Sequence, residues 1–527
     1  MFDYIIIGGG SAGCVLAGRL SEDPDTTVAL IEAGPPDKSV LIHCPAGIAA
    51  MAKTGGANWA LATVPQPGLN GRVGYQPRGK VLGGSSSINA MVYSRGHRSD
   101  YDHWAALGNT GWGYDDVLPY FKRSEHNARG ADAWHGGDGP LHVMDLAEPN
   151  PVSPAFVEAA VQAGFTRNDD FNGAEQEGVG MYQVTHKAGE RFSAAKAYLT
   201  PHLSRPNLAV FTGGQVSRIV LEGKRATGVE FMQDGLVKAL KANREVLLCA
   251  GALHSPQILM LSGIGPHAHL LHNGIGTRHD LPGVGQNLHD HPDVVQVVHT
   301  PHNKDLLGVS PGGLARVAKG ALQWRRSRSG MLTTNIAEAG GFIRSRPEEP
   351  LPDLQLHFVI GKLVDHGRKT VFGHGYSIHA CALRPQSRGS VQLNGKDPHE
   401  QPLIDPNFLG EREDMERLVR GFRIMRRIAA QPALAALGGT ESPQSAKAQS
   451  DLELEHFVRD HADTIYHPVG TCRMGSDPLA VVDAQLRVHG VAGLRVVDAS
   501  VMPSIVAGNT NAPTMMLAER AADLIRS

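Results

Sequence analysis

The sequence contains few cysteines, no long hydrophobic run and no excess of either charge. Its 5 cysteines are widely scattered and never form C-x-x-C, which argues against a disulfide framework and against a structural zinc site. No run approaches the roughly 18 apolar residues that a membrane-spanning helix needs. Because 50 basic residues face 52 acidic ones, a nucleic-acid partner is not expected.

The first residues also lack the features of a secretory signal. Met1 is followed almost at once by an apolar run, without a basic start or a cleavage site. Together with the unpaired cysteines, this predicts a cytoplasmic protein. The basic run WRRSRS at 324–329 leaves peripheral contact with the inner membrane open, although a solvated surface is the simpler interpretation.

What the sequence does contain is alternating apolar patterning over 527 residues, enough for two to four domains. The patterns predict a strand at 4–7, a helix at 12–20 and a second strand at 28–31. Much later come a strand at 245–249, a helix at 251–261 and a strand at 494–497, so both chain ends are expected in one parallel sheet. In a second region we expect one helix that begins at Ser153. A Ser450–Glu453 capping box predicts the start of another helix, which runs to residue 463. Strands are expected there at 354–360 and 390–393.

The stretch GGGSAG after the first strand permits two interpretations. Read from Gly8 it is G-x-G-x-x-G, a loop for a dinucleotide pyrophosphate, and read from Gly9 it is G-x-S-x-G, which would present Ser11 as a nucleophile. The nucleophile would need an oxyanion loop from an earlier strand, and only 10 residues precede Ser11. Glu32 ends the second strand, where an acidic residue binds ribose hydroxyls. The pattern therefore favours an adenine dinucleotide, without separating NAD from FAD.

Further motifs resemble those of the glucose-methanol-choline (GMC) oxidoreductases. They are GKVLGGSSSINAMVYSRG at 79–96, GALHSPQILMLSGIG at 251–265, LPGVGQNLHDH at 281–291, RPQSRGSVQL at 384–393, YHPVGTCRMG at 466–475 and VVDASVMP at 496–503. The likeness runs through the whole chain. Within the family it is greatest to bacterial FAD-dependent alcohol dehydrogenases, followed by choline dehydrogenases.

This resemblance implies an α/β fold of two domains: a Rossmann-like FAD-binding domain and a substrate-binding domain with a mixed sheet. The expected division assigns 1–150, 191–292 and 461–527 to the FAD-binding domain, and 151–190 and 293–460 to the substrate domain. Some relatives attach FAD covalently through a histidine just before the position of Asn89. That position is Ile88 here, so non-covalent FAD is expected.

The residues expected to bind FAD combine the glycine-rich loop with positions implied by the resemblance. They are Gly8, Gly10, Ser11, Ala12, Gly13, Glu32, Ala33, Arg78, Gly83, Ser85, Asn89, Val92, Val216, Asp498, Ala499 and Pro513. Pro513 marks the expected start of the last helix, whose N-terminus would favour an anionic reduced flavin.

For catalysis, the resemblance points to His467 and Asn509. Oxidation of an alcohol removes the hydroxyl proton as hydride leaves carbon, and an imidazole with a pKa near the working pH suits a general base. Asn509 would hold the substrate oxygen, with Asn511 as the competing choice. The His289-Asp290-His291 run looks like a metal site, but no metal is expected there.

The substrate site is less clear from sequence. Glu338, His357 and Tyr466 are predicted to contact substrate, and the apolar run at 44–53 supplies a lid. We expect oxidation of primary, aliphatic alcohols to aldehydes, with electrons passed to a quinone or another acceptor. Alternatives are an oxygen-using alcohol oxidase, choline dehydrogenase, the family's light-driven fatty-acid decarboxylase branch, a noncatalytic flavoprotein and a serine hydrolase through Ser11. The sequence leaves the oligomeric state open.

Overall fold

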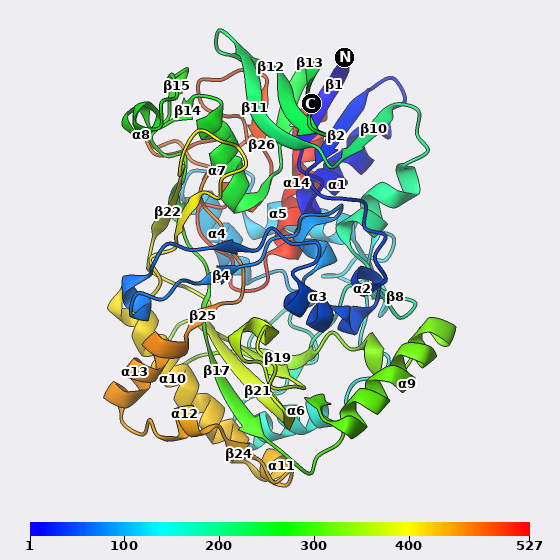
Figure 1. Ribbon diagram of the computed structural model, residues 1–527, viewed down its shortest axis with the longest axis vertical. Helices are drawn as coiled ribbons and strands as arrows, with labels where there is room; N and C mark the ends of the chain where they lie inside the picture. The colour runs from blue at the N-terminus through cyan, green and yellow to red at the C-terminus, as the bar shows by residue number, and fades with distance from the viewer.

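The computed structural model describes residues 1–527, apart from the side chain of His366. Two large sheets lie toward opposite ends of its long axis (Figure 1). The sheet containing β1 lies at the end where both chain termini are found, and the sheet containing β17 and β21 lies toward the other end. The expected α/β fold with two sheet-containing parts is confirmed.

The first sheet has seven strands, in the order β10-β2-β1-β13-β12-β11 with β26 paired to β13. Their bounds are β1 Phe2–Ile7, β2 Val28–Glu32, β10 Leu208–Thr212, β11 Gln215–Glu222, β12 Arg225–Gln233, β13 Leu236–Leu248 and β26 Leu494–Val496. Strands β10, β2, β1, β13 and β26 pair in parallel, whereas β11, β12 and β13 pair antiparallel. Strands from both ends of the chain therefore form one sheet, as the sequence predicted.

One of these strands differs from its prediction. We expected a strand at 245–249, but β13 begins at Leu236. Its first half pairs with β12 and has mostly exposed side chains, whereas Val246, Leu247 and Leu248 are buried between β1 and β26. The apolar pattern reports only the buried half because the exposed half forms a solvated antiparallel ladder.

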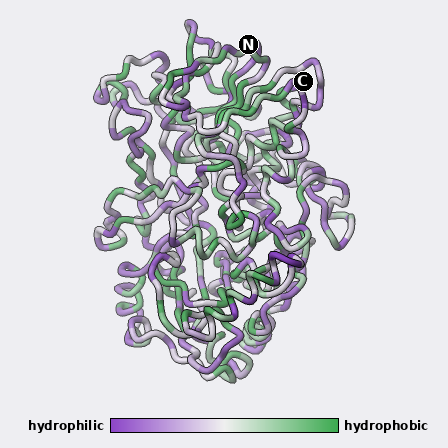
Figure 2. The backbone as a smooth tube through the Cα atoms, turned by 45° about the vertical axis from the view of Figure 1, so that its right-hand side comes forward, coloured by the Kyte–Doolittle hydropathy of each residue, from purple (hydrophilic) through white to green (hydrophobic). Residues whose placement is uncertain are grey.

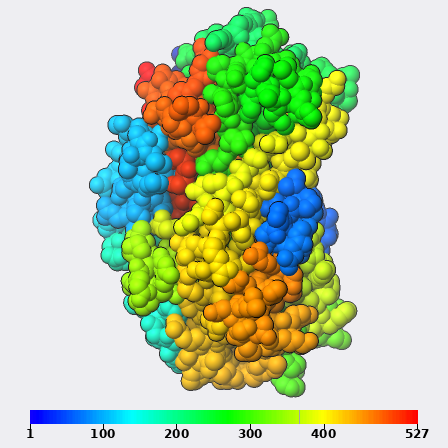
Figure 3. Space-filling model, turned by 90° about the vertical axis from the view of Figure 1, so that its left-hand side faces the viewer, coloured from blue at the N-terminus to red at the C-terminus, as the bar shows by residue number. Residues whose placement is uncertain are grey.

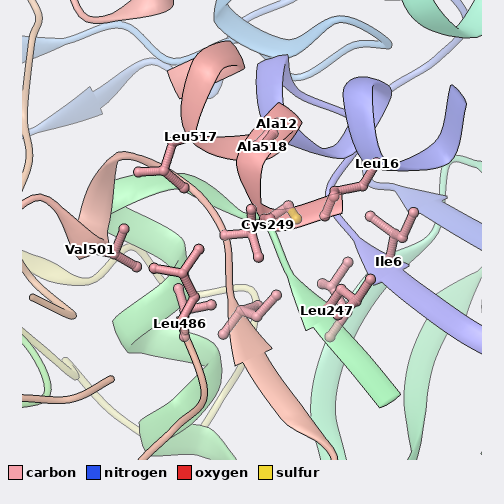
Figure 4. Packing of buried hydrophobic residues seen from close by; sticks show 14 of the residues in the cluster. Ile6, Ala12, Leu16, Leu247, Cys249, Leu486, Val501, Leu517 and Ala518 are labelled. Carbon is pink, nitrogen blue, oxygen red and sulfur yellow. The ribbon is translucent and has the colours of Figure 1, made fainter. Parts of the chain in front are cut away.

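Helices α1 Ser11–Leu20 and α7 Gly251–Leu261 pack against the first sheet, and α14 Asn511–Arg526 packs against α1. Figure 4 shows Ile6 of β1, Leu16 of α1, Leu247 of β13 and Leu517 of α14 within one buried cluster. Gly13 permits the close approach of helix and strand, because a Cβ on it would lie 1.9 Å from the Gly8 carbonyl oxygen.

The second sheet has eight strands and is antiparallel. Its strands are β7 Gly178–Met181, β17 Pro292–His299, β18 Gly308–Val309, β19 Ala337–Ile343, β20 Leu354–Val359, β21 Gly373–Ala382, β24 Thr440–Glu441 and β25 Asp463–Thr464. Helices α6 Val152–Gln162, α10 Arg412–Ala429 and α13 Asp451–His461 contribute to its hydrophobic core. The Ser450–Glu453 capping box of α13 is present, but the helix ends two residues before the expected position.

A smaller sheet contains β16 Gln286–Leu288, β22 Gly389–Gln392 and β23 Leu403–Asp405. The remaining strands form two-stranded pairs: β3 Leu61–Ala62 with β4 Tyr75–Gln76, β5 Glu125–Asn127 with β6 Leu141–Val143, β8 His186–Lys187 with β9 Glu190–Arg191, and β14 Ile264–Gly265 with β15 His279–Asp280. The other α-helices are α2 Val40–His43, α3 Ile48–Thr54, α4 Arg98–Ala106, α5 Tyr114–Ser124, α8 His267–His272, α9 Pro311–Ser327, α11 Pro432–Ala435 and α12 Pro443–Ala446.

Apolar segments lie mainly in the interior of the molecule, and polar segments lie mainly at its periphery (Figure 2). Figure 2 shows hydrophobic, green segments in the interior of the end that holds both termini, and many peripheral loops are hydrophilic. Figure 3 shows orange-red C-terminal residues beside green residues from the middle of the chain at one end of the molecule.

The division of the chain into five domain segments stays a proposal. One strand does not follow it: β25 lies after residue 461, in a segment assigned to the FAD-binding domain, but it pairs with β17 of the second sheet.

Candidate active site

A cavity of about 1440 Å³ is lined by residues of both large sheets and of the loops between them. Its walls include the glycine-rich loop after β1, the loop after β2, the segment before α4, and the loops that follow β25 and β26. The carboxyl ends of parallel strands are where open α/β sheets bind ligands. The cavity therefore combines a dinucleotide-type loop with a wall from the second sheet.

The glycine-rich loop supplies one end of this cavity. Gly8, Gly10, Ser11 and Ala12 line it, whereas Gly13 lies behind them against Gly8. A Cβ on Gly10 would meet just one neighbour within 4 Å, the Gly84 Cα at 3.9 Å. Backbone there is open to a ligand, which is what a pyrophosphate requires.

Ser11 is placed as a loop residue rather than as a nucleophile. It is the first residue of α1, and its hydroxyl donates a 2.7 Å hydrogen bond to the Asn511 side-chain oxygen. An amide oxygen cannot accept a proton as a general base would. The geometry therefore gives no support to a serine hydrolase through Ser11.

The strand ends beside this loop supply Glu32, Ala33 and Val216, which all line the cavity. Burial raises the pKa of Glu32 to about 7, although the N–H groups of Gly34 and Gly9 donate to the carboxyl and oppose the rise. Those two hydrogen bonds also fix the carboxyl at the end of β2. Glu32 thus joins the loop after β1 to the loop after β2 while facing the cavity.

The segment from Gly83 to Val92 forms another wall. Ser85, Asn89 and Val92 line the cavity, whereas Gly83 does not and instead donates its N–H to the Gly9 carbonyl. Gly83 has φ of 86°, a conformation that favours glycine. It therefore ties the two glycine-rich segments together, and Ile88 lies beside them on the cavity wall.

Arg78 lies half-buried at the cavity wall, with its Nε inaccessible to solvent. Its Nη2 donates to the Tyr466 carbonyl at 2.9 Å, while its Nε has no hydrogen-bond partner among the described residues. Burial lowers the pKa of Arg78 to about 10, which still leaves it charged. A buried donor without a partner on a cavity wall fits a ligand that carries acceptor atoms.

The loop after β26 places Asp498 and Ala499 on the cavity wall. Asp498 accepts hydrogen bonds from the Ser255 hydroxyl and from the N–H groups of Gly251 and Ser500. Burial raises the pKa of this carboxyl, and these hydrogen bonds oppose the rise. Asp498 thus joins α7 to the loop that follows β26.

The last helix begins two residues before the expected position. Helix α14 starts at Asn511, so Pro513 lies within its first turn and does not line the cavity. The loop residues Asn509 and Thr510, with Asn511 itself, form the wall at this point. The polar sequence GNTN does not show where the helix begins, because Asn and Thr are common in turns as well as at helix N-termini.

His467 lies where the cavity meets the second sheet. Its Nε2 is 3.3 Å from the Asn509 Nδ2, and its Nδ1 is 3.1 Å from the Nδ1 of His291. The carboxylate of Asp290 accepts the His467 N–H at 2.7 Å, which fixes the backbone of the histidine. Tyr466, just before it, has a left-handed φ of 70°, a strained conformation often found at functional sites.

The electrostatic surroundings keep His467 neutral. Burial lowers its pKa well below the ordinary value, and His291, His357 and Arg78 lower it further. The pKa of His467 is therefore lower than the value near the working pH that was expected from the sequence: the imidazole is neutral and can accept a proton from a ligand, but it is a weaker base than an exposed histidine.

Asn509 and Asn511 have different hydrogen-bond partners. Asn509 contacts His467 and accepts a 3.2 Å hydrogen bond from Gln355, whereas Asn511 accepts one from Ser11. Asn509 is therefore the asparagine beside His467.

Of the predicted substrate residues, Tyr466 and His357 line the cavity but Glu338 does not. The carboxylate of Glu338 accepts hydrogen bonds from the Asn150 N–H and from the hydroxyls of Ser153 and Thr334. Its prediction as a substrate contact is wrong because β19, an interior strand, turns it toward α6.

Sequence reasoning missed Asp293 and His379, which line the cavity on paired strands β17 and β21. The His379 Nδ1 and the Asp293 Oδ2 are 2.7 Å apart. Asp293 follows the LPGVGQNLHDH motif by two residues, and this was the available signal. His379 has no comparable signal because its strand reads as ordinary buried sheet.

Metal-binding groups of side chains, membrane-spanning helices and disulfides are absent from the described residues. There, no group of three or more His, Cys, Asp or Glu side chains is arranged to bind a metal. Within the same residues, no helix combines the length and apolar character needed to cross a bilayer. All five cysteines are buried and unpaired.

Comparison with known proteins agrees with this geometry. Two models described as GMC oxidoreductase match residues 2–293 and 385–518. The chain belongs to the GMC oxidoreductases. Within this family it is 48% identical over 528 residues to an alcohol dehydrogenase (acceptor) of Pseudomonas putida, covering 100% of this chain and 96% of that one.

Two further GMC-type matches are similarly extensive. Mitochondrial choline dehydrogenase of Mus musculus is 47% identical over 535 residues, covering 100% of this chain and 89% of that protein. The crystal structure of pyridoxine 4-oxidase from Mesorbium loti has a TM-score of 0.88 and 35% identity, covering 99% of each chain. The resemblance found in the motifs is thereby confirmed, and the protein is an oxidoreductase.

Proposed function

We propose that this GMC oxidoreductase binds FAD and oxidises primary aliphatic alcohols to aldehydes, passing the electrons to a quinone or another acceptor. The observation that carries the proposal is the position of neutral His467 and Asn509 on the wall of a cavity whose other end is the dinucleotide loop. The dinucleotide loop and the proposed base thus line one cavity.

The chain's residues fit FAD on several counts. Gly10 leaves backbone open at the pyrophosphate loop, and Glu32 faces the same end of the cavity, where a ribose would lie. Ser85, Asn89, Val92, Asp498 and Ala499 line the remainder of the cofactor region. The unpartnered Nε of Arg78 offers a donor for a ligand acceptor atom.

The chemistry divides between cofactor and protein. FAD held by these residues would supply the acceptor for the hydride that leaves the alcohol carbon. The neutral imidazole of His467 accepts the hydroxyl proton, so that the two hydrogens removed yield the neutral aldehyde. The Asn509 amide donates a hydrogen bond to the substrate oxygen as negative charge develops there.

Aliphatic side chains line the part of the cavity formed by the second sheet and its loops. They include Val295, Val297, Leu307, Val309, Val359, Leu363 and Val364. Ile48, Met51 and Lys53 of α3, within the run expected as a lid, also line it. An apolar wall of this kind suits the hydrocarbon chain of an alkanol.

Choline is a second candidate because Asp293 places a carboxylate on the same wall. A carboxylate can attract a quaternary ammonium, although His379 already occupies one of its oxygens. This observation points to Asp293, not Glu338, as the acidic group in contact with substrate.

The test is anaerobic mixing of the FAD-loaded protein with 1-alkanols, benzyl alcohol and choline, while the flavin absorbance is followed. We expect alkanols to bleach the flavin, with slow recovery when air is admitted. Quick recovery would indicate an oxidase instead. Bleaching by choline alone would favour the second candidate, and no bleaching by any alcohol would refute the proposed substrate class.

Helix α9 has features of a helix that contacts a membrane surface, where a quinone or an aliphatic alcohol would be found. It carries Arg316, Lys319, Arg325 and Arg326 and no acidic residue. Leu314 and Leu322 are 61% and 49% exposed, and Leu314 also lines the cavity. At 3.6 residues per turn, Arg316 and Lys319 lie on a different flank from Leu314 and Leu322, whereas Arg325 lies between the two leucines. We assign this helix to peripheral contact with an anionic lipid surface.

A further inference from the structure

His291 lies behind His467, outside the cavity lining. Its Nε2 is 3.1 Å from the Leu383 carbonyl oxygen, and its Nδ1 is 3.1 Å from the Nδ1 of His467. Burial lowers the pKa of His291 to about 3, the carbonyls of Leu383 and Val506 oppose this, and Arg384 adds to it. The ring therefore carries one proton.

The position of that proton follows from the Leu383 carbonyl, which can only accept a hydrogen bond. Nε2 of His291 must carry the proton and donate it, which leaves Nδ1 of His291 as an acceptor. The facing Nδ1 of His467 must then be the donor. Since neutral His467 also has one proton, its Nε2 is left unprotonated and can act as an acceptor.

A second chain of hydrogen bonds reaches the same conclusion from the other side. The Tyr182 hydroxyl donates to the Leu356 carbonyl at 2.6 Å, so it accepts from its other neighbours. The Gln355 group 3.3 Å from this hydroxyl must then be its NH₂. This fixes the amide orientation of Gln355 without reference to any other residue.

The same NH₂ group of Gln355 lies 3.2 Å from Asn509, whose facing atom must therefore be its side-chain oxygen. The NH₂ of Asn509 is then directed at the His467 Nε2, 3.3 Å away. A donor at this position requires an acceptor on the histidine. Two chains that begin at different backbone carbonyls thus agree on the state of one nitrogen.

We infer that His291 is a positioning residue, which holds His467 as the tautomer protonated at Nδ1 and so leaves Nε2, the nitrogen beside Asn509 at the cavity wall, as the proton acceptor. This inference deepens the proposed function and rests on it for its kinetic test. In the reaction, the hydroxyl proton passes to Nε2, giving an imidazolium whose Nδ1–H remains bonded to His291. No proton needs to leave through His291.

The kinetic test compares His291→Phe with His291→Asn in flavin-loaded protein. Phe fills the space and removes the acceptor, whereas the Asn oxygen can replace Nδ1 as the acceptor. Leaving the His467 Nδ1–H unpaired disfavours the reactive tautomer, so Phe should slow flavin reduction by roughly 10- to 100-fold with little change in the apparent Kd of the alcohol. Asn should recover most of this loss.

An unchanged rate in His291→Phe, or a rate in His291→Asn as low as in Phe, would overturn the inference. A purely structural role would reduce flavin content or stability in proportion to the rate, so both are measured in each variant. The alcohol used is the one that reduces the wild-type flavin fastest.

A direct measurement covers the case in which a variant does not fold. ¹⁵N-histidine NMR of the wild-type holoenzyme reports which nitrogen carries the proton, and the His467 signals are those missing from His467→Gln. Protonation at Nδ1 is expected, and protonation at Nε2 would contradict the inference. If no alcohol reduces the flavin, the proposed function fails, yet the spectrum still decides the tautomer.

Discussion

At the scale of single residues, the proposed mechanism depends on a neutral histidine whose Nε2 is the acceptor nitrogen. Burial and the neighbouring His291, His357 and Arg78 all act in the same direction on the pKa of His467. Asn509 completes the pair at the cavity wall. Each contribution comes from a different part of the chain, so single substitutions can separate them.

Replacing His467 with Ala should leave a yellow, FAD-loaded protein whose rate of flavin reduction is lower by roughly 10² to 10⁴ fold, the range for general base catalysis. Stopped-flow absorbance under anaerobic conditions measures this rate. Asn511→Ala is the control, since Asn511 contacts Ser11 and not His467. A wild-type rate in His467→Ala would remove this residue from the mechanism.

Ile88 predicts how the flavin is attached. It lines the cavity at the position where some relatives have a histidine bonded to FAD, and its hydrocarbon side chain cannot form such a bond. Acid precipitation of the holoenzyme should therefore release all flavin into the supernatant. Absorbance of the washed pellet checks this, and flavin remaining there would show a covalent bond to another residue.

At the scale of elements, the contact between β1 and α1 sets the shape of the dinucleotide loop. Gly13→Ala would place a Cβ 1.9 Å from the Gly8 carbonyl oxygen, so backbone must shift. We expect at least about 3 kcal/mol of destabilisation, the upper part of the range for overpacking. Thermal unfolding of protein stripped of flavin measures the effect without a contribution from ligand binding.

Gly10→Ala is the matched control for that substitution. Its Cβ would meet the Gly84 Cα at 3.9 Å, an ordinary contact, but it would project at the cavity wall. We expect an unchanged melting temperature without flavin and a weaker affinity for FAD. Equal melting temperatures for the two variants would disprove the packing argument.

Helix α9 should bind anionic vesicles through its exposed leucines and its basic side chains. Leu322→Gln removes an apolar side chain from that surface and should weaken binding by about tenfold, consistent with partial burial of one leucine. The control is Leu236→Gln, because Leu236 is also exposed but belongs to β13 of the first sheet.

Sedimentation with phosphatidylcholine vesicles, with and without phosphatidylglycerol, tests the membrane contact. Binding should require the anionic lipid and weaken as salt is added, because exposed charges are screened. Equal binding of both vesicle types, or equal losses in the two leucine variants, would exclude the proposed surface.

At the scale of the whole molecule, a buried ionic network joins distant segments. Arg95 pairs with Glu125 at 2.6 Å, and the two ring nitrogens of His135 lie 3.1 Å from Glu125 and 3.0 Å from Asp170. Burial lowers the pKa of His135, but hydrogen bonds to Asp170 and Glu125 outweigh it and raise the pKa to about 9.

This network predicts stability that depends on pH. Because the folded pKa of His135 exceeds its unfolded value of about 6.5, its contribution is fully present below that pH and is lost as pH rises toward about 9. The urea midpoint should therefore fall between pH 6.5 and 9. In His135→Gln the fall should be smaller, and an identical fall in both proteins would rule out this origin.

Much of the fold could be predicted because its signals are local. The run before Gly8 and the periodic helix after it specify β1 and α1 within a few residues. The motifs at 79–96 and 466–475 predicted Asn89 and His467 as site residues, and both line the cavity. Prediction failed for the exposed half of β13 and the start of α14, where side-chain pattern is a weak guide to backbone pairing.

The sequence by itself determined the family, the dinucleotide loop and the presence of His467, since these depend on residue types at short spacings. Tertiary structure alone decided that Glu338 faces α6, that Asp293 and His379 share a cavity wall, and that His291 supports His467 from 176 positions away. The physical reason is that a side chain's hydrogen-bond partners depend on how strands and loops distant in sequence are packed. No short stretch of the chain contains that information.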